Sequence, residues 1–209
     1  MSRSPLHVIL LGPPGAGKGT QAAALAQRLG LVHISPGQIL REEAENHSPA
    51  GRQVRDVMAQ GRLVPDELVD ELVRERLEAL TPAQGFVLDG YPRTAGEARA
   101  LRETLAEVHR LQRRPFVVWL QAPGEVLRAR IRKRSREQHR VDDTDDAVTK
   151  RLEAYSDSTG ELRRALECWT DLIVIDADQP PDRITEEIVA VLCGQAAAGT
   201  SAAICPHCT

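Results

Sequence analysis

Four glycines and one lysine stand in the segment from Gly12 to Thr20, which reads GPPGAGKGT. Glycines let a loop wrap closely around a phosphate, and successive backbone N–H groups then point inward to bind the anion. A helix that begins directly after such a loop directs its positive end toward the same anion. Lys18 adds a full positive charge for the β- and γ-phosphates. The segment therefore predicts a nucleoside triphosphate site rather than a turn without a ligand.

One position of this segment departs from the general pattern of phosphate-binding loops. Gly19 stands where a serine or threonine usually follows the lysine, and Thr20 comes one residue later. The hydroxyl at that position normally contacts magnesium. We therefore expect no direct magnesium ligand immediately after Lys18.

Arginines recur in the loops and helices of the remaining chain. A guanidinium holds phosphate oxygens with two parallel hydrogen bonds and stays charged, which suits a site that gathers several phosphates. The alternative is a set of solvated surface side chains. The run RARIRKRSREQHR, from Arg128 to Arg140, is also compatible with a nucleic-acid patch, although it contains no aromatic residue. The arginines considered for phosphate contacts are Arg41, Arg93, Arg130, Arg134, Arg140 and Arg151.

Short apolar runs alternate with segments of helical periodicity along the chain. Most of these runs are continuous rather than alternating, as expected for parallel strands buried on both faces. Strand–helix–strand repetition predicts a parallel five-stranded sheet with helices on both sides, an α/β fold of three layers. The predicted strands are 8–11, 32–34, 86–89, 116–120 and 172–176. The predicted helices are 19–29, 38–45, 50–60, 66–80, 95–111, 124–134, 143–165 and 181–192.

Length and charge argue against several classes of protein. A chain of 209 residues with 42% hydrophobic residues is long enough for one domain with a real core. Its net charge of −3 differs from that of general nucleic-acid binders, which are usually basic. No apolar run approaches the roughly 20 residues of a membrane span, and the first apolar stretch is too short for a secretory signal. We expect a cytoplasmic protein without nucleic acid or membrane as a partner.

Five motifs in order resemble those of the adenylate kinase family of nucleoside monophosphate kinases. They lie between residue 6 and about residue 192 and read GPPGAGKGTQA, SPGQILREE, GRLVPDELV, LDGYPRTAGEA and HRVDDTDDAVTKRLEAY. The resemblance implies a P-loop NTPase-like fold with a helical insertion for the monophosphate and a short lid. It also implies reversible, Mg²⁺-dependent transfer of the terminal phosphoryl group of ATP to a nucleoside monophosphate.

The resemblance also implies roles for individual residues. The expected catalytic residues are Lys18, Arg93, Arg140 and Arg151. The expected ATP contacts are Gly15, Ala16, Gly17, Lys18, Gly19, Thr20, Arg130, Arg134 and Gln179. The expected monophosphate contacts are Pro36, Arg41, Arg62, Leu63, Val64, Gly90, Tyr91, Pro92, Arg93, Glu97, Arg140 and Arg151. Asp89 is expected to orient water around magnesium, although an aspartate after a strand can also cap the next turn.

The expected boundaries follow the same motifs. One kinase domain is expected at 1–192, with its core at 1–34, 65–133 and 142–192, the monophosphate-binding insertion at about 35–64 and the short lid at about 134–141. The short lid contains no cysteine, so we expect no structural zinc. Residues 193–209 are expected to be a disordered tail, although its CPHC sequence is also compatible with a redox pair or half of a zinc site.

Glu97 and Pro36 depart from the pattern of AMP-preferring relatives. Those relatives carry a glutamine at the first position, where a side-chain amide matches one acceptor and one donor of adenine. An ionised carboxylate only accepts hydrogen bonds and better suits the two adjacent donors of guanine. Pro36 offers neither a hydroxyl nor an N–H where those relatives have threonine. The alternative is that Glu97 points to solvent and another group reads the base.

The expected acceptor is AMP, because the motifs as a whole are those of adenylate kinases. GMP, a pyrimidine or a modified nucleoside monophosphate is the alternative acceptor. A catalytically weak, nucleotide-binding regulatory protein is the alternative of another class, and the intact Lys18, Arg93, Arg140 and Arg151 argue against it. We expect the chain to act as a monomer.

Overall fold

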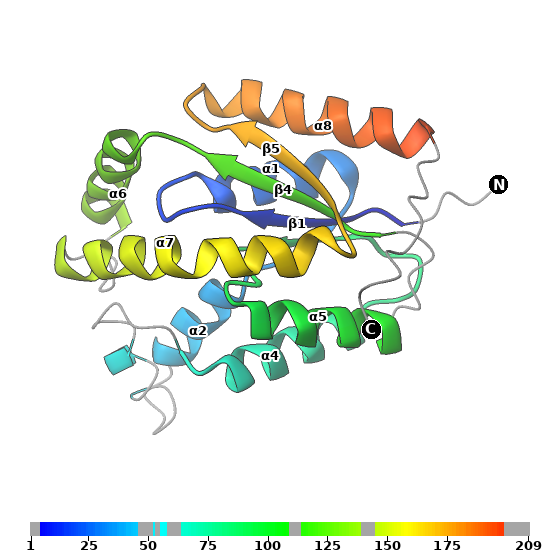
Figure 1. The fold of residues 1–209 in the computed structure, drawn as a ribbon, viewed down its shortest axis with the longest axis horizontal. Coiled ribbons are helices and arrows are strands. Elements are labelled where there is room, and N and C mark those ends of the chain that lie inside the picture. The colour runs from blue at the N-terminus through cyan, green and yellow to red at the C-terminus, as the bar shows by residue number, and fades with distance from the viewer. Residues whose placement is uncertain are drawn as a thin grey trace.

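Five parallel strands form one sheet in the order β2–β3–β1–β4–β5 (Figure 1). The computed structural model describes residues 5–45, 52, 55–57, 64–108, 114–138 and 145–198. The strands are β1 (His7–Leu11), β2 (Val32–Ile34), β3 (Phe86–Asp89), β4 (Phe116–Gln121) and β5 (Asp171–Asp176). All the predicted strands are confirmed, and their ends differ from the predicted ends by one residue at most.

The helices follow the predicted pattern, and α6, α7 and α8 end later than predicted. They are α1 (Lys18–Leu29), α2 (Pro36–Glu45), α4 (Asp66–Glu78), α5 (Ala95–Val108), α6 (Gly124–Gln138), α7 (Asp145–Glu167) and α8 (Pro181–Ala198). Most of the predicted helix at 50–60 lies outside the described residues. Helix α6 extends to Gln138, into the expected lid, because its last residues are good helix formers.

The predicted disordered tail is wrong for residues 193–198. Helix α8 continues through Ala198, because the segment before that residue is rich in alanine, which has the highest helix propensity. The remainder of the expected tail, including Cys205 and Cys208, lies outside the described residues.

Side chains of β1 alternate between two apolar layers. Val8 and Leu10 pack in a cluster with α1 and α8, whereas Ile9 and Leu11 pack in a cluster with α4, α5 and α7. Figure 1 shows α1 and α8 on one side of the sheet and α4, α5 and α7 on the other. The sheet is thus buried on both faces, as parallel sheets require. Within the described part of the chain, no helix is long and apolar enough to cross a membrane.

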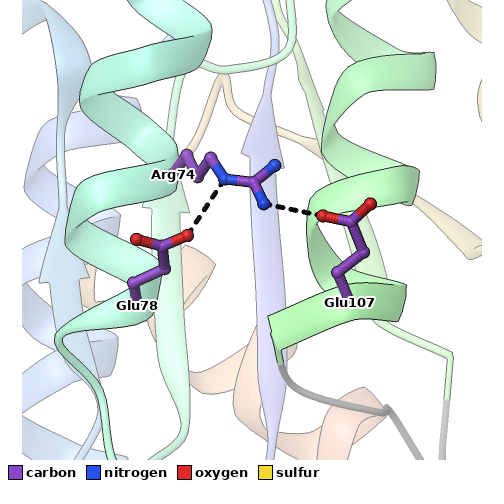
Figure 2. A network of polar contacts seen from close by, with 3 residues as sticks. All are labelled: Arg74, Glu78 and Glu107. Atoms are coloured by element: carbon purple, nitrogen blue, oxygen red, sulfur yellow. Dashed lines mark hydrogen bonds and ion pairs between the residues drawn. The ribbon is translucent and has the colours of Figure 1, made fainter.

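Helices α4 and α5 lie side by side and run in the same direction. The hydroxyl of Thr94, just before α5, donates to Asp66 Oδ2 at the start of α4 over 2.7 Å. Further along, Arg74 donates to Glu78 Oε1 at 2.9 Å and to Glu107 Oε2 at 2.6 Å (Figure 2). Exposed ion pairs of this kind contribute little to stability. The buried apolar faces of the two helices therefore carry their packing, and the polar contacts set their register.

Candidate active site

The loop between β1 and α1 curls around the ammonium group of Lys18. Lys18 Nζ donates to the carbonyl oxygens of Gly12 and Pro13 at 2.8 Å and 3.0 Å. Gly12 has φ +143°, and a Cβ there would lie 2.5 Å from the carbonyl oxygen of Leu120, so only glycine fits. The loop therefore has the tight curl that the sequence predicted, with the lysine at its centre.

Lys18 keeps its positive charge at an electrostatic cost. Burial lowers the pKa of Lys18 to about 8; the charge of Asp89 opposes this effect, while those of Arg93, Arg134 and Arg151 add to it. These arginines come from the loop after β3, from α6 and from α7. The structure thus gathers positive charge at one place, which a polyphosphate would neutralise.

Asp89 ends β3 beside this loop. Its Oδ2 accepts a hydrogen bond from the Ser35 hydroxyl at 3.3 Å and lies 3.6 Å from His33 Nε2, beyond hydrogen-bonding distance but close enough for electrostatic attraction. Burial acts to raise the pKa of Asp89, but His33, Lys18 and Ser35 outweigh it and hold that pKa below its usual value. A Cβ on Gly19 would lie 3.4 Å from Oδ2. An ionised carboxylate beside the loop fits a hydrated magnesium ion, which retains several of its waters.

Arg93 and Lys18 flank the same glycine. Arg93 Nε donates to the Gly90 carbonyl at 2.9 Å, and a Cβ on Gly90 would lie 3.2 Å from Lys18 Cε. Gly90 also has φ +72°, a conformation that favours glycine. A Cβ on Gly37 would lie 3.5 Å from both Arg41 Nη1 and Arg93 Nη2. Two guanidinium groups therefore meet at the first turn of α2, next to the lysine.

Two of the residues predicted to contact ATP, Arg130 and Gln179, lie beside the edge strand β5. Arg130 Nη1 donates to the carbonyl oxygen of Ala177, after β5, at 2.8 Å. Gln179 lies in the same segment, and its amide donates to the Asp176 carbonyl at 3.1 Å and to Glu187 Oε2 at 3.2 Å. Helix α6 and the segment after β5 are therefore joined where the sequence predicted ATP contacts.

Tyr91 does not present its side chain to this site. It is 1% exposed and packs in the core, and its hydroxyl donates to Asp70 Oδ1 at 2.5 Å. Burial and the neighbouring Asp70 raise the pKa of Tyr91 above its usual value. The predicted contact between Tyr91 and the monophosphate would therefore have to be made by the backbone of this residue.

Other predicted residues are placed only in part. Val64 is buried in the core, and Pro36 begins α2. Arg62, Leu63 and Arg140 lie outside the described residues, as do residues 139–141 of the expected lid. In the described ranges, no three His, Cys, Asp or Glu side chains are grouped to hold a metal ion. A lid without zinc stays a prediction.

Glu97 is 3% exposed, so the alternative of a solvent-facing side chain is wrong. Its Oε2 accepts hydrogen bonds from the backbone N–H groups of Arg93 and Thr94, the latter at 3.4 Å, and its own N–H donates to Thr94 Oγ1 at 3.1 Å. This reciprocal pair is a capping box at the start of α5. The sequence TAGE carries the signal for it, which the motif-based interpretation missed. A contact between Glu97 and the base stays a prediction.

Burial also changes the ionisation of Glu97. It raises the pKa of this carboxyl group to about 7, against the opposing effects of the Arg93 backbone hydrogen bond and the Arg93 charge. Asp66 and Asp70 raise the pKa further by repulsion. The carboxyl group is therefore poised to gain or lose a proton near neutral pH.

Phosphoryl transfer needs little covalent chemistry from a protein but much positive charge in one place. The carboxyl edge of this sheet supplies that charge from the first loop, the loop after β3, α6 and α7. By its fold and this site, the chain is a P-loop kinase.

Comparison with known proteins narrows this class. A sequence model of the adenylate kinase family matches residues 10–167. The chain is 42% identical to an adenylate kinase of Xylella fastidiosa over 188 aligned residues. This alignment covers 90% of this chain and 99% of that protein. It is 42% identical to an adenylate kinase of Thermus thermophilus over 185 aligned residues. That alignment covers 88% of this chain and 96% of that protein. The chain belongs to the adenylate kinase family and is a nucleoside monophosphate kinase.

Proposed function

We propose that this enzyme transfers the terminal phosphoryl group of ATP reversibly to AMP, giving two molecules of ADP. The observation that carries the proposal is that Lys18 and Arg93 both lie against Gly90. One cation belongs to the triphosphate loop, and the other meets Arg41 on the acceptor side. The relatives named adenylate kinase support AMP as the acceptor.

The residues divide the work between two substrates. The N–H groups of the loop and Lys18 hold the phosphates of ATP, with Arg130, Arg134 and Gln179 as further proposed contacts. Arg93 and Arg41 hold the phosphate of AMP with two-pronged hydrogen bonds. Positioning two bound reactants supplies much of the rate enhancement, because it removes the entropic cost of their encounter.

The reaction needs no covalent enzyme intermediate. An oxygen of the AMP phosphate forms a bond to the terminal phosphorus of ATP, and the bond from that phosphorus to its bridging oxygen breaks, which leaves ADP on each side. The attacking phosphate is already largely ionised at neutral pH, so no catalytic base is required. Lys18 and Arg93, joined in our proposal by Arg140 and Arg151, stabilise charge on the transferred group.

Magnesium bound with ATP would neutralise part of the phosphate charge. Asp89 would hold waters of such a hydrated ion, since its carboxylate lies beside Gly19 and is ionised at neutral pH. Gly19 provides no hydroxyl ligand of its own.

One chain carries the residues proposed for both substrates, so we propose that the enzyme acts as a monomer. We place it in the cytoplasm, where ATP and AMP are available, without nucleic acid or membrane as a partner. The insertion at about 35–64 and the lid at about 134–141 are the parts proposed to close over the substrates.

A panel assay tests this function. The enzyme is supplied with ATP, magnesium and one monophosphate at a time (AMP, GMP, CMP or UMP), and ADP formation is measured. We expect the highest kcat/KM with AMP. If kcat/KM is higher with another monophosphate, that monophosphate and not AMP is the preferred acceptor. If none of them is turned over, the alternative of a regulatory protein is favoured. Omitting magnesium should abolish the activity.

A further inference from the structure

The loop that carries Arg93 is held by hydrogen bonds from two helices. On the α4 side, Tyr91 donates to Asp70 Oδ1 at 2.5 Å, and Thr94 donates to Asp66 Oδ2 at 2.7 Å. On the α5 side, Glu97 accepts the backbone N–H groups of Arg93 and Thr94 through one carboxylate oxygen. The backbone of Arg93 is therefore fixed directly by a buried side chain.

The guanidinium of Arg93 depends on the same loop for its direction. Arg93 Nε donates to the Gly90 carbonyl at 2.9 Å, and Nη2 then approaches the first turn of α2. Both contacts require the segment from Gly90 to Thr94 to keep its shape. The hydrogen bond from the Arg93 N–H to Glu97 Oε2 links the start of α5 to that shape.

We propose that Glu97 is a positioning residue for Arg93, and that it acts on binding of the acceptor's phosphate rather than on selection of its base. This inference rests on the proposed function, because it assigns a role within the same acceptor site. The carboxylate oxygen Oε2 is directed at backbone N–H groups, where it completes the capping box with Thr94. A side chain in this position influences every monophosphate equally, whatever its base.

The charges that face Glu97 make this role sensitive to pH. Arg93 favours its ionised form, whereas Asp66, Asp70 and burial favour the protonated form, so that its pKa lies at about 7. Hydrogen bonds to an ionised acceptor are stronger than those to a neutral one. Protonation therefore weakens the hold on the Arg93 backbone, and acceptor binding should weaken as the pH falls through neutrality.

Three variants test the role of Glu97. Glu97→Ala removes the acceptor, Glu97→Gln retains an acceptor oxygen of the same reach, and Glu103→Ala is the matched control from an exposed position of the same helix. KM and kcat are measured with AMP and with GMP at saturating ATP. Ribose 5-phosphate, which has the phosphate and sugar but no base, is used as a competitive inhibitor.

A positioning role predicts a common factor for all acceptors. Glu97→Ala should raise KM for AMP, KM for GMP and the inhibition constant of ribose 5-phosphate by about tenfold each, the size of an ordinary lost cap contact. Glu97→Gln should recover most of this loss, because glutamine also completes capping boxes. It should also remove the part of the KM increase below neutral pH that belongs to Glu97. The control should resemble the parent enzyme.

Base selection predicts a different pattern. If Glu97→Gln changes the AMP-to-GMP ratio of kcat/KM by about tenfold or more while ribose 5-phosphate binding is unchanged, Glu97 reads the base and the positioning role is overturned. Values within about twofold of the parent for Glu97→Ala would also overturn it, because that difference is below 1 kcal/mol.

If Glu97→Ala does not fold, Thr94→Val tests the other half of the capping box and should show the same common factor, while unchanged constants in that variant would overturn the proposal. Failure of the proposed function is separate, because it appears as a lack of AMP turnover in the parent enzyme.

Discussion

The buried positive charge of Lys18 lowers the stability of the folded enzyme. Its pKa of about 8 lies below the ordinary 10.5, so the folded enzyme holds this charge against burial and three arginines. Between those two pH values the unfolded chain binds more protons than the folded one, so stability rises with pH across this window. Below pH 8 the full cost applies. Phosphates that arrive in the loop remove this cost, and part of the affinity for ATP has this origin.

Replacing Lys18 with methionine should therefore separate activity from stability. We expect turnover to fall on the order of 10²–10³-fold, the cost of deleting one preorganised electrostatic group. At neutral pH the variant should be more stable than the parent by about 1–3 kcal/mol, since the buried charge is gone. Urea unfolding and ADP formation measure the two effects, with the exposed Lys133→Met as control. Near-normal turnover would exclude the proposed role of Lys18.

Glu97 predicts a stability effect with its own pH dependence. Its pKa of about 7 in the folded enzyme exceeds the ordinary 4.5. Glu97 therefore contributes stability that is fully present below pH 4.5 and is lost as the pH rises through 7. Glu97→Gln should gain about 1–3 kcal/mol over the parent near pH 8, and the gain should shrink toward pH 5. Urea unfolding at both pH values, with Glu103→Gln as control, measures it. An equal gain at both values would show that ionisation of Glu97 is not the cause.

At the scale of elements, the sequence predicted the positions of the strands but not which strands pair with one another. Continuous apolar runs such as FVLD identify a strand buried on both faces, and the structure confirms these runs. The sequence carries no comparable signal for the pairing of β2 with β3, which brings Ser35 and His33 to Asp89. Partners that depend on strand order therefore required the structure.

Local signals in the sequence were also missed where a functional motif covered them. TAGE is both part of the expected monophosphate motif and a capping box, and the motif alone does not reveal the second role. The burial of Tyr91 was missed for the same reason, because the motif assigned that residue to the substrate. Its hydroxyl instead joins the loop after β3 to α4. A structural role and a functional role compete for the same residues in this segment.

The contacts between α4 and α5 should differ strongly in their importance. Tyr91→Phe should lower stability by about 1–3 kcal/mol, because Asp70 loses the buried partner of its carboxylate. Glu107→Gln should have no measurable effect, because the ion pair with Arg74 in Figure 2 is exposed on both sides. Thermal unfolding of the two variants compares them directly. An equal loss in both would show that the exposed pair contributes as much as the buried hydrogen bond, against this prediction.

At the scale of the whole molecule, the site must exclude water to work. Water can attack the terminal phosphorus of ATP in place of the acceptor phosphate, so an open site would lose ATP to hydrolysis. The converging cations lie at the carboxyl edge of a sheet packed on both faces, which gives them a rigid base. Closure of the proposed insertion and lid over bound substrates would remove water from the reaction.

Closure predicts a movement that depends on which substrate is bound. A two-substrate mimic should bring both the insertion at about 35–64 and the lid at about 134–141 toward Lys18, while the five strands superpose on those of the ligand-free enzyme. AMP alone should move mainly the insertion, since Arg41 and Arg93 meet at α2, and an ATP analogue alone should move mainly the lid. Crystal structures of the four states, superposed on the sheet, measure these shifts. If both segments keep their ligand-free positions with the mimic bound, closure does not occur, and water must be kept from the phosphorus by the fixed residues of the site alone.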